Sequence, residues 1–329
     1  MIDVEMLDVV GIGNAIVDVI ASADDAFLDA QSMRKGAMTL VDERRAEDIY
    51  RAMGSAIVAS GGSAGNTIAG VASLGGKTGY IGKIRDDEFG TAFRHDITAV
   101  GTIFRTPAAT HGPATAHCLI LVTPDSQRTM NTYLGACVNL CPDDIDEQLI
   151  TSARVTYLEG YLYDDPSAKR AFHKAAEIAH DAGRKVALSL SDAFCVDRHR
   201  DDFLDLVEHH VDVLFGNQAE IESLFQCELP VAIARLRKLT DLAAVTLGPE
   251  GSLVISRDEM LEIPAEPVQR VVDTTGAGDL YAAGFLFGLT RGAPLHECGR
   301  IGSLAAAEII SHFGARPQTP LAEFVHSLS

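Results

Sequence analysis

The chain has 329 residues, 47% of them hydrophobic and 22% charged, which is the composition of a water-soluble globular protein with a sizeable core. Its formal net charge of −19 argues against nucleic acid or an anionic membrane as a partner, and no apolar run is long enough to span a bilayer. The start shows no signal-peptide pattern and the 6 cysteines are scattered without metal-site spacing, so we expect a cytoplasmic protein that acts on a small molecule.

Short strands and helices alternate in the first third of the chain. Strands are predicted over residues 8–13, 16–21, 38–41, 57–59 and 79–84. Helices are predicted over 42–53, from the turn at 61–62 to 74, and over 87–100. The Gly-x-Gly at 11–13 lacks the third glycine of a dinucleotide fingerprint, and Gly76-Lys77-Thr78 has the wrong spacing for a phosphate loop.

Residues 104–133 change character, because they are rich in threonine and alternate between apolar and polar positions. A Pro-Asp turn at 124–125 separates the two halves, which predicts an antiparallel hairpin. With the extended pieces at 17–22 and 37–42, the segment 104–133 is expected to form a small separate sheet. We interpret this sheet as a lid built from insertions in a single domain that spans 1–329.

From residue 149 onward, predicted strands and helices alternate regularly up to residue 247. This pattern indicates a parallel sheet with helices on both faces. A hairpin at 251–263 and two helices, at 277–291 and 295–312, complete the chain. The predicted fold class is therefore α/β, with a mostly parallel central sheet.

The stretch 271–281 places an apolar extended segment and a glycine turn directly before a helix. Gly276 and Gly278 allow successive backbone N–H groups to converge on one anion, and the helix N-terminus adds positive partial charge. Asp279, in the first helical turn, is either a helix cap or a general base that accepts a proton from an attacking hydroxyl.

The string Asp-Thr-Thr-Gly-Ala-Gly-Asp at 273–279, with Ala-Ala-Gly-Phe at 282–285, closely resembles the second signature of the ribokinase-like (PfkB) family of carbohydrate and nucleoside kinases. The resemblance favours the general base over the cap. It implies a ribokinase-like fold with a Rossmann-like sheet, ATP and Mg²⁺ as cofactors, and Asp279 as the base. The amides of Gly276, Ala277 and Gly278 would form the anion hole.

The same resemblance assigns further residues on both sides of the site. The substrate side is expected to contain Asn14, Ile16, Asp18, Gly62, Ser63 and Asn66. The nucleotide side is expected to contain Asn217, Glu220, Thr246, Gly248, Gly251 and Thr275, with Glu220 holding Mg²⁺ through water. In some members Asp273 and Thr275 would join the loop 314–317 in holding a monovalent cation such as K⁺. Taken alone, Asp18 is more typical of an exposed strand-end acid, and the flanking motifs favour its role in substrate binding. For Asn66, Asn217 and Glu220 the alternative is helix capping.

Several features point to the substrate. Ile68 departs from the small residue that the first family signature usually has there, and the Gly-Gly-Ser-x-x-Asn turn resembles that of adenosine kinases. In those enzymes a purine is sandwiched, which implies Tyr161 and Phe194 here with Ile16 alongside; the alternative for both aromatics is core packing.

We therefore predict phosphorylation of a primary hydroxyl, most simply the 5′-hydroxyl of adenosine, yielding AMP and ADP in purine salvage. The alternatives are a sugar kinase of the same family, such as a ribokinase, fructokinase or 2-keto-3-deoxygluconate kinase, and a non-catalytic ligand-binding protein on the same fold. The sequence leaves open whether the protein is a monomer or a homodimer.

Overall fold

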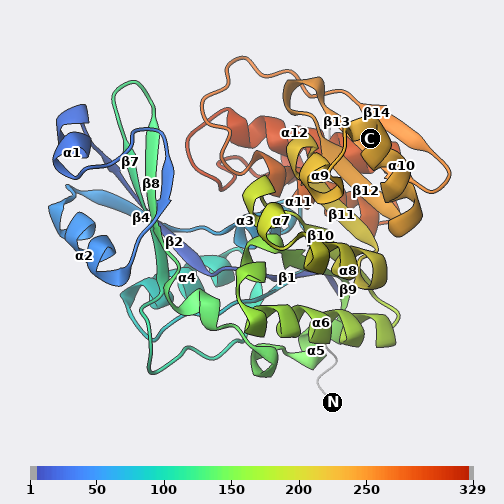
Figure 1. The fold of residues 1–329 in the computed structure, drawn as a ribbon, viewed down its shortest axis with the longest axis horizontal. Coiled ribbons are helices and arrows are strands. Elements are labelled where there is room, and N and C mark those ends of the chain that lie inside the picture. The colour runs from blue at the N-terminus through green and yellow to red at the C-terminus, as the bar shows by residue number, and fades with distance from the viewer. Residues whose placement is uncertain (1–5, 326–329) are drawn as a thin grey trace.

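The computed structural model describes residues 6–325, which form a large lobe and a small lobe, each built around its own sheet (Figure 1). Across the large sheet the strands are β14 (Met260–Ile263), β13 (Ser252–Ser256), β12 (Leu242–Thr246), β11 (Val213–Asn217), β10 (Lys185–Ser189), β9 (Ala153–Glu159), β1 (Leu7–Ile12), β5 (Thr78–Ile81) and β6 (Ile103–Phe104). Neighbouring strands are parallel except at β12–β13 and β13–β14. The predicted α/β class with a mostly parallel sheet is confirmed.

Helices cover both faces of the large sheet because successive residues of its strands point to opposite sides. In β1, Val9 belongs to one core cluster and Val10 to the other. The first face carries α3 (Ser63–Ser73), α4 (Glu88–Ala99), α11 (Ala277–Thr290) and α12 (Leu295–Ile310). The second carries α5 (Glu147–Thr151), α6 (Pro166–Asp181), α7 (Ala193–Arg198), α8 (Arg200–His210), α9 (Gln218–Phe225) and α10 (Leu229–Leu239). Short elements complete the lobe: α13 (Ala322–Val325) and the 3₁₀ turns Gly135–Asn139, Pro142–Asp144, Gly160–Asp164 and Gly248–Glu250.

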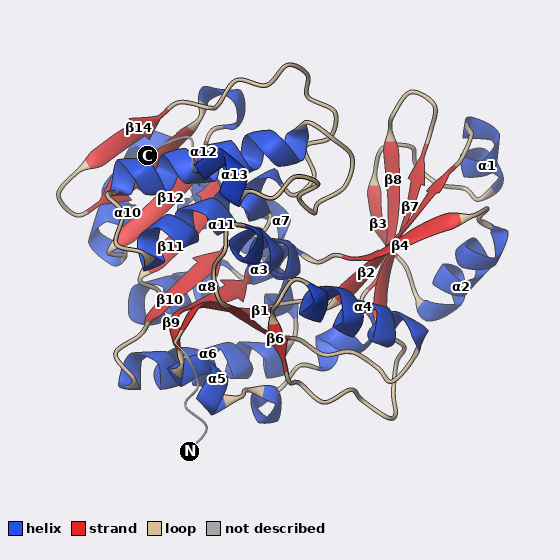
Figure 2. Cartoon of the chain, turned by 180° about the vertical axis from the view of Figure 1, so that it is seen from behind, coloured by secondary structure: helices blue, strands red, loops and turns tan. Residues whose placement is uncertain are grey.

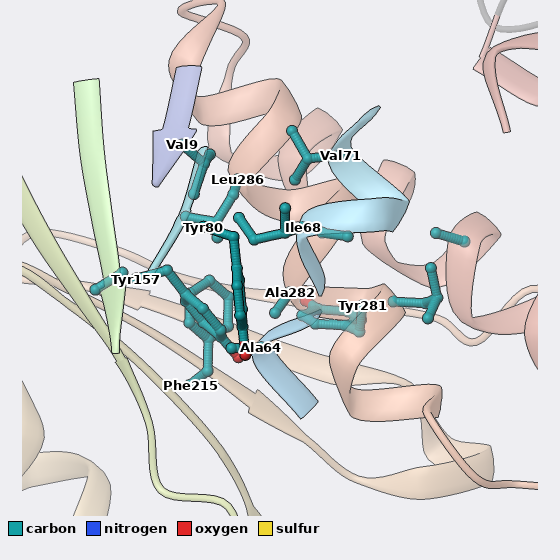
Figure 3. Close-up of a cluster of buried hydrophobic side chains, with 14 of the residues drawn as sticks. Val9, Ala64, Ile68, Val71, Tyr80, Tyr157, Phe215, Tyr281, Ala282 and Leu286 are labelled. Atoms are coloured by element: carbon teal, nitrogen blue, oxygen red, sulfur yellow. The ribbon is translucent and has the colours of Figure 1, made fainter. Parts of the chain in front are cut away.

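The core on the first face fixes α3 and α11 against the centre of the large sheet. Ile68 of α3 and Leu286 of α11 lie beside Val9 and Tyr80 in this cluster (Figure 3). All four side chains are almost completely inaccessible to water. Burial of Val9, Ile68 and Leu286 contributes roughly 1.5–3 kcal/mol for each side chain. The N-terminal ends of α3 and α11, which carry Ser63 and Asp279, are therefore held in fixed relation.

The small lobe consists of residues 16–60 and 116–133, which lie to one side of the large lobe (Figures 1 and 2). Across its sheet the strands are β3 (Met38–Leu40), β8 (Arg128–Tyr133), β7 (Ala116–Val122), β2 (Ile16–Ser22) and β4 (Ala56–Ser60). Two helices pack beside it, α1 (Asp25–Ala30) and α2 (Glu43–Ala52). The β7–β8 pair is an antiparallel hairpin, as predicted, whereas β2–β7 and β3–β8 are parallel.

The structure contains short helices that the sequence analysis did not predict, among them α1, α5 and α7, and it also differs from the predicted extended segments. Strand β4 belongs to the small sheet, where it pairs with β2. Phe104 belongs to the large sheet instead, because its ring packs against Tyr80 and Phe93 in the core. The segment before the glycine turn is not a strand: Val271 is 53% exposed, and the amide of Val272 bonds to the carbonyl of Ile310 at the end of α12. Among residues 6–325, no helix is long and apolar enough to cross a membrane.

Candidate active site

A cavity of about 690 Å³ lies where the chain passes between the two lobes. Its floor comes from residues at the carboxyl ends of β1, β9, β10, β11 and β12, which is where open parallel sheets form their sites. The small lobe contributes a largely apolar wall of Met38, Leu40, Ile120 and Met130. The cavity is therefore enclosed jointly by residues of both sheets.

The glycine turn before α11 forms one end of this cavity. Gly276 has φ of 80°, in the left-handed region, and a Cβ there would lie 2.9 Å from that of Ala315. Within the described chain, the amides of Gly276, Gly278 and Asp279 donate to no protein acceptor, and Gly278 borders open space. Both glycines and Ala277 line the cavity, but the Ala277 amide, predicted to join the anion hole, donates to the carbonyl of Thr274 at 3.2 Å. The other, free donors at this helix N-terminus are suited to an anion.

Asp279 lies at the junction of α11 and α3. Its Oδ1 accepts a hydrogen bond from Ser63 Oγ at 2.6 Å, and its Oδ2 accepts one from Asn66 Nδ2 at 2.9 Å. Burial raises the pKa of Asp279, while these two donors and the charge of Arg316 oppose the rise. The Asp279 side chain accepts no hydrogen bond from a backbone amide of α11. It therefore does not act as a helix cap in this structure.

Two polar groups near Asp279 have unused hydrogen-bonding capacity. Asn66 Oδ1 is buried without a partner among the described residues, and no hydrogen bond to the Asp18 carboxylate occurs there. Burial raises the pKa of Asp18 to about 6, against the opposing charges of Arg128 and Arg316. Because a buried polar atom without a partner is costly, Asn66 Oδ1 fits a ligand hydroxyl, and the partly buried Asp18 carboxylate offers a second acceptor.

The chain passes between the lobes at two turns, 13–15 and 61–62, and Gly62 brings the second against the first. It has φ of 83°, and a Cβ there would overlap the carbonyl oxygen of Asn14. The side chain of Asn14 lines the cavity next to Ile16, which opens β2. The substrate-side residues predicted from sequence, Asn14, Ile16, Asp18, Gly62, Ser63 and Asn66, all line this one cavity.

Glu159, at the end of β9, is a site residue that the sequence analysis missed. It is 1% exposed and accepts hydrogen bonds from Asn14 Nδ2 at 2.6 Å, from the Asn14 amide at 3.3 Å and from the Ala64 amide at 2.8 Å. Burial raises its pKa to about 7 although these donors lower it. The available signal was an acid that ends an apolar strand, since such strands end at the site edge.

The nucleotide-side residues are only partly brought together. Asn217 and Glu220 line the cavity and also form a capping box at the start of α9, with Glu220 Oε2 accepting from the Asn217 amide at 2.9 Å. Burial raises the pKa of Glu220 to about 7. Thr246 and Thr275 line the cavity as well, whereas Gly248 and Gly251 do not. Gly251, with φ of 97°, instead lies against the carbonyl of Ile263 in the β13–β14 hairpin.

The Asp273 carboxylate, expected to hold a monovalent cation, already has a full set of protein partners. It forms an ion pair with Arg128 of β8, in the small lobe. Thr275 donates to it through its amide at 3.0 Å and its hydroxyl at 2.7 Å, and the Gly314 amide donates at 3.3 Å. The negative charge that would attract K⁺ is thus balanced by a guanidinium.

The two aromatic residues predicted to hold a purine lie at the rim of the cavity. Tyr161 is 39% exposed and Phe194, on α7, is 78% exposed, so neither is a core residue. Both line the cavity, together with Ile16 and the ion pair of Arg198 with Asp164. An exposed apolar ring beside a cavity offers area for stacking a flat ligand.

The cavity is strongly acidic. Its lining includes the carboxylates of Asp18, Glu159, Asp164, Asp192, Glu220 and Asp279 but only one basic side chain, Arg198. In the described part of the chain no three His, Cys, Asp or Glu side chains converge on a point, so no protein-only metal site exists there. Carboxylates that line a cavity without converging suit Mg²⁺, because this ion prefers oxygen ligands and keeps waters and substrate phosphates in its shell.

Comparisons with known proteins agree with this geometry. The model of the pfkB family of carbohydrate kinases matches residues 39–322. The crystal structure of adenosine kinase from Sinorhizobium meliloti is 50% identical, with 98% of this chain and 100% of that chain covered and a TM-score of 0.91. A probable sugar kinase protein from Rhizobium etli is 47% identical, with 98% and 99% covered and a TM-score of 0.91. Adenosine kinase from Saccharomyces cerevisiae is 27% identical over 92% of this chain and 94% of its own length.

Proposed function

Because this chain belongs to the pfkB family of carbohydrate kinases, we propose that it is an adenosine kinase that transfers the γ-phosphoryl group of ATP to the 5′-hydroxyl of adenosine. The O5′–H proton passes to Asp279, a new O5′–P bond forms, and the bond from the γ-phosphorus to the bridging oxygen breaks, leaving AMP and ADP. Kinase chemistry follows from the family; the nucleoside acceptor is our proposal.

The observation that carries the proposal is the position of Asp279 beside unpaired amides. Ser63 and Asn66 hold its two oxygens, which fixes the carboxylate at the end of the cavity where Gly276 and Gly278 expose their N–H groups. A carboxylate so placed can accept the hydroxyl proton while the amides bind the phosphoryl oxygens. The base and the anion hole then lie on one helical turn.

Two features support a nucleoside as the acceptor. Asp18 and Asn66 Oδ1 offer acceptors for the vicinal hydroxyls of a ribose, and Tyr161 and Phe194 offer rings for a purine further along the same cavity. A free sugar would use the first pair and leave the rings without a partner. The similarity to the Sinorhizobium meliloti adenosine kinase over the whole chain supports the same acceptor.

The acidic lining of the cavity implies that Mg²⁺ neutralises the phosphates of ATP. With one basic residue among the lining side chains, the protein itself offers little positive charge to the phosphates of ATP. Bound Mg²⁺ would supply that charge, held through water by Glu220, with Asn217 beside it. The small lobe would act as a lid, because its apolar wall excludes water from the phosphoryl group.

The test is ADP release with Mg·ATP and a panel of adenosine, inosine, guanosine, ribose, fructose and 2-keto-3-deoxygluconate. We expect turnover with adenosine well above the other acceptors, and its loss in Asp279→Asn. Turnover with a free sugar alone would support a kinase but refute the nucleoside acceptor. The 47% identity to a probable sugar kinase makes this the main competing outcome. Adenosine binding without any ADP release would indicate a non-catalytic binding protein.

A further inference from the structure

Three consecutive residues near the end of the chain, Gly314 to Arg316, connect the glycine turn before α11 with the start of α3, and we call them the C-terminal bracket. The Gly314 amide donates to the Asp273 carboxylate, and Ala315 packs under Gly276 of the glycine turn. The third residue, Arg316, reaches in the opposite direction, toward the start of α3. The glycine turn and the first turn of α3 are thus held by neighbouring residues of one loop.

Arg316 spans the turn that joins the small lobe to α3. Its Nε donates to the carbonyl of Ser60 at 3.0 Å and its Nη2 to the hydroxyl of Ser60 at 3.1 Å, at the end of β4. Its Nη1 donates to the carbonyl of Gly65 at 2.6 Å, in the first turn of α3. One planar group therefore fixes both ends of the 60–65 segment.

The 60–65 segment contains or adjoins the groups that hold the proposed base. Ser63 lies within it and Asn66 follows it directly, and both donate to Asp279. A shift of the segment would move both donors together, because Asn66 is bonded through its amide to the carbonyl of Gly62. Arg316 does not line the active-site cavity, although Ala315 does, so its influence on the site is exerted through other residues.

From these contacts we propose that Arg316 is a positioning residue for phosphoryl transfer: it fixes the 60–65 segment so that Ser63 and Asn66 orient Asp279. The proposal rests on the kinase function above. It extends the site to a loop residue that lies 251 positions from Gly65 in the sequence. The positive charge of Arg316 adds a second effect, which makes the role measurable.

The charged and titratable groups that face Arg316 are Asp18, Tyr80, Asp96 and Asp279. Burial lowers the pKa of Arg316 to about 10, so it stays protonated at neutral pH. Its charge lowers the pKa of both Asp18 and Asp279, against the larger effect of burial. Removal of the charge would raise both pKa values, and the acid limb of kcat/KM would then move to higher pH.

The experiment compares Arg316→Gln and Arg316→Lys with Arg94→Gln as the matched control. Arg94 is also a partly buried arginine that donates to two backbone carbonyls, those of Phe104 at 3.1 Å and Thr106 at 2.7 Å, but it lies away from the base. Three quantities are measured for each variant: amide hydrogen exchange of the 60–66 segment, kcat and KM separately, and the pH profile of kcat/KM.

We expect Arg316→Gln to lower kcat at least tenfold, to speed exchange in 60–66, and to move the acid limb upward by a measurable fraction of a pH unit. Arg316→Lys keeps the charge but not the planar fork, so its acid limb should stay at the wild-type position while exchange still rises. Arg94→Gln should change none of the three. If Arg316→Gln does not fold, the lysine variant alone decides, because unaltered exchange and kcat there would overturn the proposal.

The outcomes separate this proposal from the proposed function. Wild-type protein that turns over no acceptor would refute the kinase assignment, and the exchange of 60–66 would still test the contacts of Arg316. Active wild-type protein with an Arg316→Gln variant that matches it in kcat, pH profile and exchange would refute the role of Arg316 alone. A fall in kcat with an unmoved acid limb and unaltered exchange would also overturn it.

Discussion

The two ends of the active-site cavity differ in how firmly their side chains are held. At the acceptor end, Glu159 and Asn66 are buried and Asp279 is partly buried, and hydrogen bonds of these residues link α3, α11 and the turn at 13–15. At the rim, Tyr161 and Phe194 are partly or largely exposed, and Phe194 stands on the short helix α7. On the proposed function, the chemistry would depend on this fixed geometry, and the choice of acceptor would depend on the exposed rings.

The acceptor end also bears a cost that the rim does not. Burial raises the pKa of Asp18, Glu159 and Asp279, so their ionised forms oppose folding at neutral pH. At the rim, the only unfavourable contribution to the free energy of folding is that the apolar rings stay exposed to water. Substitutions at the acceptor end should therefore change rate and stability strongly, and those at the rim should change affinity modestly.

The largest effect is expected from Asp279→Asn. If the acceptor end holds the base, kcat for adenosine should fall on the order of 10³-fold while KM stays near the wild-type value. Glu297→Gln is the control, because Glu297 is also an acid in the first turn of a helix, α12. Steady-state ADP release measures both. A loss of less than tenfold for Asp279→Asn would remove it from the chemistry.

The next largest effect is expected from Gly62→Ala. A Cβ at 62 would overlap the carbonyl of Asn14 and requires a left-handed φ, so we expect a loss of roughly 3 kcal/mol or more in the free energy of unfolding. Gly75→Ala is the control: Gly75 has φ of 87° but no atom near its missing Cβ. Urea unfolding of both variants separates overlap from backbone strain. Equal losses would show that the contact with Asn14 contributes nothing.

A smaller effect, with a sign that depends on pH, is expected from Asp18→Asn. The folded-state pKa of Asp18 is raised from 3.8 to about 6, so the stability from its protonated form is present below pH 4 and lost as pH rises through 6. Asp18→Asn should therefore stabilise the ligand-free protein at pH 8, on the order of 2 kcal/mol, and have little effect near pH 4. Adenosine affinity should fall in the same variant.

Thermal unfolding at the two pH values checks this prediction. A stability gain that is equal at pH 4 and pH 8 would show that the Asp18 charge is not responsible. A destabilised variant at pH 8 would show that the Asp18 carboxylate has stabilising partners in the ligand-free protein, whereas the structure gives it no hydrogen bond among the described residues.

The smallest effects are expected at the rim, from Phe194→Ala and Tyr161→Ala. Stacking on one aromatic ring contributes about 0.5–1.5 kcal/mol, so KM for adenosine should rise roughly 2- to 10-fold with kcat nearly unchanged. Phe313→Ala, which removes a ring that is 46% exposed but does not line the cavity, is the control. A fall in kcat comparable with that of Asp279→Asn would abolish the distinction between the two ends.

Much of the fold was predictable because its signals are local. The alternation of strands and helices after residue 149 predicts the parallel sheet, and the glycine turn before α11 predicts an anion site. The assignments failed where packing overrides pattern. Phe104 pairs in the large sheet because of its ring contacts in the core, and β4 pairs with β2 although α1, β3 and α2 lie between them in the chain.

By itself, the sequence determined the element order and the glycine turn that ends at Asp279, since periodicity and turn residues act over a few positions. Only the tertiary structure decided which side chains meet at the acceptor end. Glu159 reaches Asn14 across 145 positions, Arg128 pairs with Asp273 across 145, and Arg316 binds Ser60 across 256. No local pattern encodes such pairs, because they exist only once two lobes and a C-terminal loop have packed together.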